Sequence, residues 1–195
     1  MGPQRTEENV VKSKATGKSL EIFTIGHSTR PIDQFIELLE QNQVTQLIDI
    51  RTIPKSRHNP QFNSDELAAS LRAAQIRYVH LKELGGLRRA RSDSVNLGWR
   101  NLSFRGFADY MQTPEFEAAL RKLIELAQAQ RAALMCAEAV PWRCHRSLVA
   151  DALTARGINV FEIVSAKPPT EHKLTSFARV SGTSITYPAN QASLL

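Results

Sequence analysis

The segment 134–147 reads LMCAEAVPWRCHRS and joins two different hydrophobic patterns. The apolar run from Ala132 to Cys136 predicts a buried strand. After Pro141 the apolar residues follow helical spacing, which predicts a helix that stops at Gly157. A strand followed directly by a helix is the building unit of α/β proteins, so this segment indicates that fold class.

The same alternation of strand and helix extends along the rest of the chain. Further apolar runs predict strands at residues 20–25, 44–50, 76–81 and 158–164. Helices are predicted to begin near Pro31, after Asn63 and after Thr113, with Asn63 as an N-cap whose partner is Glu66. We therefore expect an α/β fold, a three-layer Rossmann-like domain with a parallel sheet of about five strands and helices on both faces.

The chain divides into one domain with additions at both ends and one insertion. Residues 1–18 are polar and predict a flexible tail, residues 19–165 form the single α/β domain, and residues 166–195 predict an extension that packs on it. The insert at 82–106 carries six basic and two acidic residues, so it holds +4 of the chain's net +6. Long connections of this kind tend to be lids or binding loops, and we expect this one to close over a site.

Composition limits the classes of protein and of partner. The 195 residues, 42% hydrophobic, suit a globular domain, and we expect no membrane partner because no apolar run reaches spanning length. Two cysteines make no disulfide framework, which favours a reducing, cytoplasmic location. The net charge of +6 favours an anionic small molecule or nucleic acid as partner, and the oligomeric state stays open.

Polar residues follow most of the predicted strands. Their positions are Gly26-His27-Ser28, Asp49, Arg51, His80, Cys136 and Glu138. The carboxyl ends of parallel strands share one edge of the sheet, and ligands of open α/β sheets bind outside that edge. We therefore expect the site there.

Three residues are predicted to be catalytic. Glu138 is a general acid or base if it is desolvated among the arginines, and a structural ion pair is the alternative. Cys144 and His145 fall in the predicted first turn of a helix, where the dipole favours a thiolate nucleophile. Cys144 also shares the apolar stripe of that helix, so simple core packing is the alternative.

Other uses of the same residues stay open but are less favoured. Cys136, Cys144 and His145 could bind a metal with His27 or His80, but their spacing matches no paired-cysteine zinc pattern, so we assign no metal. A redox pair of the two cysteines is a further alternative. Neither cysteine has the arginine six residues on that a phosphatase loop needs. No glycine-rich phosphate loop occurs, so neither a dinucleotide nor ATP is indicated and the cofactor is left unknown.

Guanidinium groups near strand ends and a helix start suit a phosphate or a carboxylate. The alternative is that Arg51 pairs with Asp49 and that Arg143 is merely solvated. The predicted anion-binding residues are His27, Ser28, Arg51, Arg57, Arg143 and Arg146.

These motifs, in this order, resemble a bacterial and archaeal family, the domain-of-unknown-function family four-eight-eight. The matching pieces are TIGHS (24–28), DIR (49–51), LGG (84–86), FADYM (107–111), CAE (136–138), CHR (144–146) and HKLT (172–175). The resemblance covers residues 22–175. It implies a single Rossmann-like α/β domain and no particular activity, because the family is named for having none assigned.

We expect an enzyme that hydrolyses or transfers a group of a phosphate-bearing substrate related to nucleotides or nucleic acids. In that hypothesis the arginines hold the anionic group and the insert covers the pocket. The alternative is a non-catalytic module that binds nucleic acid through the basic insert. Binding to a phosphate backbone weakens steeply with salt, which separates the two hypotheses.

Overall fold

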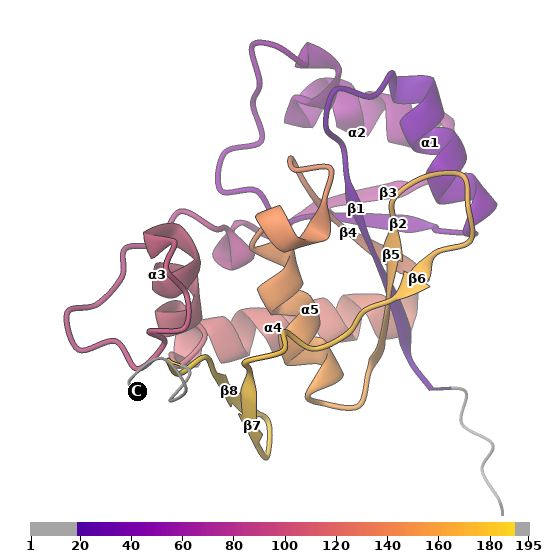
Figure 1. Cartoon of the computed structure of the whole chain (residues 1–195). Helices are drawn as coiled ribbons and strands as arrows, with labels where there is room; N and C mark the ends of the chain where they lie inside the picture. Colours follow the sequence, from indigo (N-terminus) through magenta and orange to yellow (C-terminus); the bar gives the residue numbers. More distant parts are fainter. Residues whose placement is uncertain (1–18, 190–195) are drawn as a thin grey trace, which may run out of the picture.

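A mostly parallel six-stranded sheet forms the centre of the computed structural model, which describes residues 19–189 (Figure 1). The strand order is β3-β2-β4-β1-β5-β6. The strands span β1 (Glu21–Gly26), β2 (Gln46–Asp49), β3 (Arg77–His80), β4 (Ala132–Cys136), β5 (Asn159–Ile163) and β6 (Thr170–Glu171). The five strands β1 to β5 run parallel, as predicted, and β6 pairs antiparallel with β5.

Helices cover both faces of the sheet, which confirms the three-layer architecture. Helices α1 (Ile32–Gln41) and α2 (Ser64–Ala73) lie on one face, and α4 (Pro114–Ala129) and α5 (Arg146–Thr154) on the other (Figure 1). Successive strand residues point to opposite faces, so Phe23 packs with α1 and α2 while Ile22 packs with α4 and α5. The two faces bury separate hydrophobic clusters, and both helical layers are fixed to one sheet.

The segment after β5 contacts the domain through a polar network as well as apolar side chains. The hairpin β7 (Arg179–Ser181) and β8 (Ser184–Thr186) leads to Tyr187, which is fully buried. Tyr187 Oη donates to the Asp151 carboxylate at 2.9 Å, and His172 Nε2 approaches the same carboxylate at 2.8 Å. Asp151 on α5 therefore anchors the chain's later segment.

Local details refine the predicted boundaries. Asn63 stands at the N-cap of α2, but its side chain accepts from the Ser56 amide at 2.8 Å, so the predicted capping bond is wrong. The side chain of Thr113, in contrast, accepts from the Phe116 amide at the start of α4. The insert contains the 3-10 turn η2 (Lys82–Leu84) and the first half of helix α3 (Leu102–Tyr110).

Two expectations concern the ends of the chain and the membrane. The predicted flexible tail at 1–18 and residues 190–195 lie outside the described residues. Within residues 19–189, no helix combines the length and apolar composition that crossing a bilayer requires.

Candidate functional site

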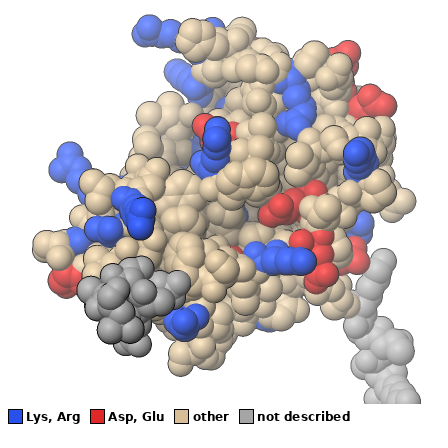
Figure 2. Space-filling view, in the orientation of Figure 1, with Lys and Arg blue, Asp and Glu red and all other residues tan. Residues whose placement is uncertain are grey.

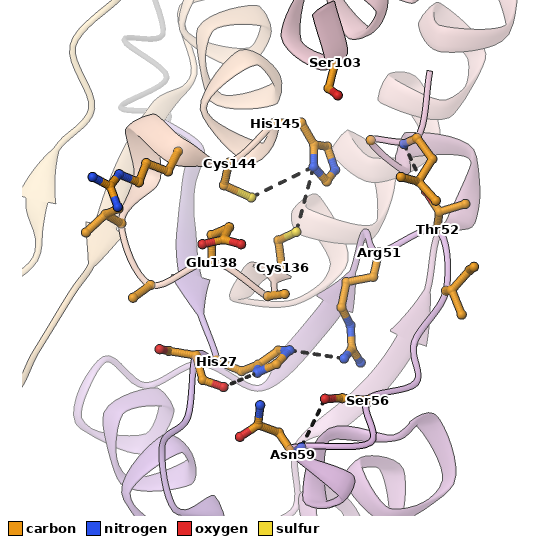
Figure 3. Close-up of a pocket in the computed structure, with 18 of the residues that line it drawn as sticks. His27, Arg51, Thr52, Ser56, Asn59, Ser103, Cys136, Glu138, Cys144 and His145 are labelled. Atoms are coloured by element: carbon orange, nitrogen blue, oxygen red, sulfur yellow. Dashed lines mark hydrogen bonds between the residues drawn. The ribbon is translucent and has the colours of Figure 1, made fainter. Parts of the chain in front are cut away.

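A cavity of about 820 Å³ opens at the carboxyl edge of the sheet, where the sequence predicts the site. The loops after β1, β2 and β4 form its walls, and the insert contributes Gly86, Leu87, Ser103 and Phe104 (Figure 3). Ligand pockets usually measure about 300–1,000 Å³. The cavity is therefore large enough for a nucleotide or a sugar phosphate.

Two cysteines and a histidine meet on one wall of the cavity. The sulfurs of Cys136 and Cys144 lie 3.8 and 3.9 Å from His145 Nδ1 (Figure 3). Both cysteines are buried and free, and the three ligand-type atoms lie within 4.8 Å of one another. We call Cys136, Cys144 and His145 the Cys–His cluster.

Backbone geometry sets the positions of the cluster. Cys136 is the last residue of β4, Cys144 is extended between the 3-10 turn η3 (Pro141–Arg143) and α5, and His145 is the N-cap of α5. The prediction that Cys144 and His145 lie in the first helical turn is therefore wrong by one to two residues. The extended backbone at Cys144, with φ −129° and ψ 139°, precedes the helix.

The tautomer of His145 follows from its backbone partners. Its Nε2 lies 3.1 Å from the Leu84 carbonyl and 3.3 Å from the Ile50 carbonyl. A carbonyl oxygen only accepts, so Nε2 carries the proton and, in the neutral ring, Nδ1 presents its lone pair to both sulfurs. The ring is therefore oriented by backbone from two other segments.

The two thiols influence each other. The Cys136 side chain lowers the pKa of Cys144 well below that of an ordinary thiol, and the Cys144 side chain raises the pKa of Cys136. Burial raises the pKa of both, whereas His145 and Arg146 lower the pKa of Cys144. Negative charge is thus favoured on Cys144.

Arg146 supports the loop that carries Glu138. It is 1% exposed, and its guanidinium donates to the backbone carbonyls of Glu138 and, at 2.9 Å, of Ala139. A Cβ on Gly26 would lie 2.7 Å from the Glu138 carbonyl carbon, so glycine is required there. Arg146 does not line the cavity, so these contacts give no support to its predicted anion-binding role, which stays a prediction.

Glu138 lines the cavity but is not desolvated. Its side chain is exposed, which corrects the expectation of a buried carboxylate. Figure 3 shows it among the residues that line the cavity, which also include Cys136 and Cys144. Arg146 contacts its backbone carbonyl, and no hydrogen bond or ion pair of the described residues engages its carboxylate.

Arg51 and His27 form a second buried group at the cavity wall. Arg51 pairs with Asp49 at 2.6 Å and donates to the Phe62 carbonyl at 2.8 Å, so its guanidinium is occupied by protein partners. This is the ion-pair alternative, and it corrects the expectation that Arg51 is free for an anion. Burial lowers the pKa of His27 to about 4; its neutral ring donates from Nδ1 to the Ser28 carbonyl and accepts at Nε2 from Arg51.

The exposed cations at the cavity agree only in part with those predicted from the sequence. Arg143 is exposed and lines the cavity, as does Lys55, whereas Arg57 is exposed but outside the cavity lining. Ser28 lines the cavity with a positive φ of 51°. Lys55 was missed although the basic loop between two prolines was visible in the sequence, because nothing in the pattern says which loop side chains turn inward.

Gly86 is a second residue whose role was missed. A Cβ at this position would lie 2.6 Å from Cγ of His145, so the insert approaches the ring only because residue 86 is glycine. The glycine pair in the insert was a visible signal. Its meaning needed the position of His145, which follows 59 residues later in the sequence.

The basic insert holds many of its own charges. Arg88 lies over the Tyr110 ring at 3.6 Å, Arg91 pairs with Asp93 at 2.8 Å, and Arg105 donates to the Trp99 carbonyl at 3.0 Å. Figure 2 shows Lys and Arg scattered over the visible face rather than gathered in one patch. Three of the six basic side chains of the insert thus have partners within the protein.

Comparison with known proteins gives one match. The sequence model described as "Domain of unknown function DUF488" matches residues 31–153. No curated protein and no solved structure matches the chain. The matched range includes Glu138 and the whole Cys–His cluster.

Proposed function

The chain belongs to the DUF488 family, and from the chemistry of its cavity we propose that it is an enzyme that hydrolyses or transfers a group of a phosphate-bearing small molecule related to nucleotides. One observation carries the proposal: a Cys–His cluster, an exposed carboxylate and exposed cations line the same cavity. A structural network needs neither the open volume nor the exposed charges.

The cations at the rim are the proposed anion-binding groups. Arg143 presents a guanidinium fork and Lys55 a flexible ammonium, and both suit phosphate oxygens. Ser28 adds a hydroxyl on the β1 side. The proposal does not include three arginines that were predicted from the sequence. Arg51 and Arg146 have partners within the protein, and Arg57 lies outside the cavity lining.

Glu138 is the proposed acid–base group. The attacking oxygen, from water or an acceptor hydroxyl, forms a bond to phosphorus or to a sugar carbon. The bond from that atom to the leaving oxygen breaks, and the leaving oxygen keeps the electron pair. Glu138 takes the proton of the attacking oxygen and returns it to the leaving oxygen. The Cys–His cluster lies at the reacting end of the bound substrate.

Nucleic-acid binding by the insert remains the alternative, but the contacts favour it less. Three of the six basic side chains in the insert contact protein partners, namely Arg88, Arg91 and Arg105. The expected cytoplasmic location also stays a prediction, and it agrees with the two neighbouring free cysteines.

A thermal-shift screen tests the proposed function. Nucleotides, nucleosides, sugar phosphates and short DNA or RNA are added to the wild type, to Arg143→Ala and to Arg121→Ala, an exposed helix position outside the cavity lining. A ligand of the folded state raises the melting temperature. We expect a phosphate-bearing small molecule to stabilise the wild type and Arg121→Ala but not Arg143→Ala. Stabilisation by polynucleotides alone, equal in all three proteins and lost with salt, would contradict the proposal.

A further inference from the structure

We propose that Cys136, Cys144 and His145 bind one Zn²⁺ ion and leave its fourth coordination position open to the cavity. The three residues come from the end of β4 and the start of α5, so the fold itself brings them together. Their ligand atoms lie within 4.8 Å of one another without any other metal-ligating group of the described residues among them.

The distances suit a tetrahedral ion. With Zn–S near 2.3 Å and Zn–N near 2.0–2.1 Å, a tetrahedral centre places sulfur and nitrogen about 3.6 Å apart. The two sulfur–nitrogen distances are 3.8 and 3.9 Å, so each sulfur–nitrogen pair needs a shift of a few tenths of an ångström to close on the ion, and all three ligand atoms lie within 4.8 Å of one another. Ordinary thermal motion of side chains covers such shifts.

His145 is oriented as a metal ligand. Its Nε2–H donates to the carbonyls of Leu84 and Ile50, which leaves the Nδ1 lone pair directed at the two sulfurs. Ligating histidines commonly donate their other ring nitrogen to a carbonyl or carboxylate in this way. The close approach of Gly86 holds the ring in that orientation.

Charge favours a dication at this place. The cysteines are 7% and 3% exposed, and two buried thiolates side by side would repel each other at low dielectric. Zn²⁺ binding releases one proton from each thiol to solvent, and the two thiolates then neutralise the ion. Thiolate and imidazole ligands select zinc over magnesium or calcium, which prefer oxygen.

The fourth position has no protein ligand that reaches it among the described residues. Neither His27 nor His80 has a ring nitrogen in the group of ligand atoms within 4.8 Å of one another, and His27 uses both of its nitrogens, toward the Ser28 carbonyl and Arg51. This corrects the sequence-based idea that either histidine completes the set. A water in the open position would lie in the cavity that Glu138 also lines, and its catalytic meaning rests on the proposed function.

Metal analysis of the full chain tests the site without an activity assay. The tag-free protein is purified without chelator and its zinc content is measured by mass spectrometry. We expect one zinc per chain in the wild type and in His58→Gln, an exposed histidine outside the cluster. In Cys144→Ser and His145→Gln, the content should fall about tenfold or more. Unchanged zinc in these variants would overturn the proposal.

Cobalt gives a second readout that needs no variant to fold. Co²⁺ replaces zinc in the wild type, and we expect thiolate-to-cobalt charge-transfer absorption together with the visible bands of a tetrahedral ion. Inorganic phosphate should change the visible bands if the fourth position is open. Absence of the charge-transfer absorption, with both thiols alkylated as readily with zinc as without, would overturn the metal site. Arg143-dependent stabilisation by a phosphate ligand would then still support the proposed enzyme.

Discussion

Two histidines, the buried His172 and the half-buried His145, show the difference between a structural network and a reactive one. His172 bonds the carboxylates of Asp151 and Glu162 with both ring nitrogens, each at 2.8 Å. His145 fixes one nitrogen on backbone carbonyls and turns the other toward two sulfurs. Sulfur forms weak hydrogen bonds, so the second histidine keeps a lone pair available for a metal or a proton. His172 therefore has hydrogen-bond partners for both ring nitrogens, whereas His145 lines the cavity.

Breaking the structural network should have the largest effect. Asp151→Ala removes the carboxylate that His172, Thr175 and Tyr187 share, and it leaves the buried Tyr187 hydroxyl and His172 Nε2 without this partner. We expect the free energy of unfolding to fall by about 3–5 kcal/mol, measured by urea denaturation. Asp93→Ala, which removes a surface ion pair with Arg91, is the control and should change nothing measurable. A small effect of Asp151→Ala would show that this network does not stabilise the folded protein.

The network should also make stability depend on pH. Burial alone lowers the pKa of His172, but hydrogen bonds to Asp151 and Glu162 outweigh it and raise the pKa from 6.5 to about 9. The folded state therefore binds more protons than the unfolded state between these values. The resulting stabilisation, about 3 kcal/mol at most, is complete below pH 6.5 and disappears as the pH rises through 9. Urea denaturation between these pH values should show this slope in the wild type, and His172→Gln should flatten it.

Displacing the His145 ring tests whether its orientation is needed for zinc binding by the Cys–His cluster. Gly86→Ala places a Cβ against the ring and should lower zinc content, with a stability loss of about 1–3 kcal/mol from the added atom. Gly98→Ala is the matched control, because its Cβ would lie 2.6 Å from the Pro188 carbonyl oxygen, away from the cluster. Equal loss of zinc in both variants would point to general unfolding rather than to displacement of the ring.

The smallest effect on stability is expected at Glu138. Glu138→Gln changes an exposed side chain, so the free energy of unfolding should stay within about 0.5 kcal/mol. Turnover of a substrate found in the ligand screen should fall about 10²-fold or more if the carboxylate transfers the proton. Full activity of this variant would remove Glu138 from the mechanism and leave the Cys–His cluster as the only reactive group proposed.

The fold was the most predictable part of the molecule. Apolar runs such as 132–136 and helical spacing after Pro141 are local patterns, and each predicts its element without knowledge of the rest. The parallel order then follows from helical connections between strands. The sixth strand was not predicted, because Thr170 and Glu171 are too short and too polar to show a pattern, and only pairing with β5 makes them a strand.

The position of the cavity was predictable from the sequence, but the residues that line it were predictable only in part. Polar residues that follow strands must gather at one edge, which located His27, Cys136 and Glu138 near one another. The sequence does not show which cations have partners within the protein. Arg51 pairs with Asp49 and donates to the Phe62 carbonyl, whereas Arg143 is exposed.

The strand–helix alternation, the family and the polar edge of the sheet can be read from the amino-acid sequence, because they depend on residues that are neighbours in the chain. The tautomer, exposure and hydrogen-bond partners of the individual side chains, in contrast, depend on the tertiary structure. The lone pair of His145, the exposure of Glu138 and the internal contacts of Arg146 depend on segments far apart in sequence. Burial and hydrogen-bond partners set the chemistry of a side chain, and folding alone brings those partners together.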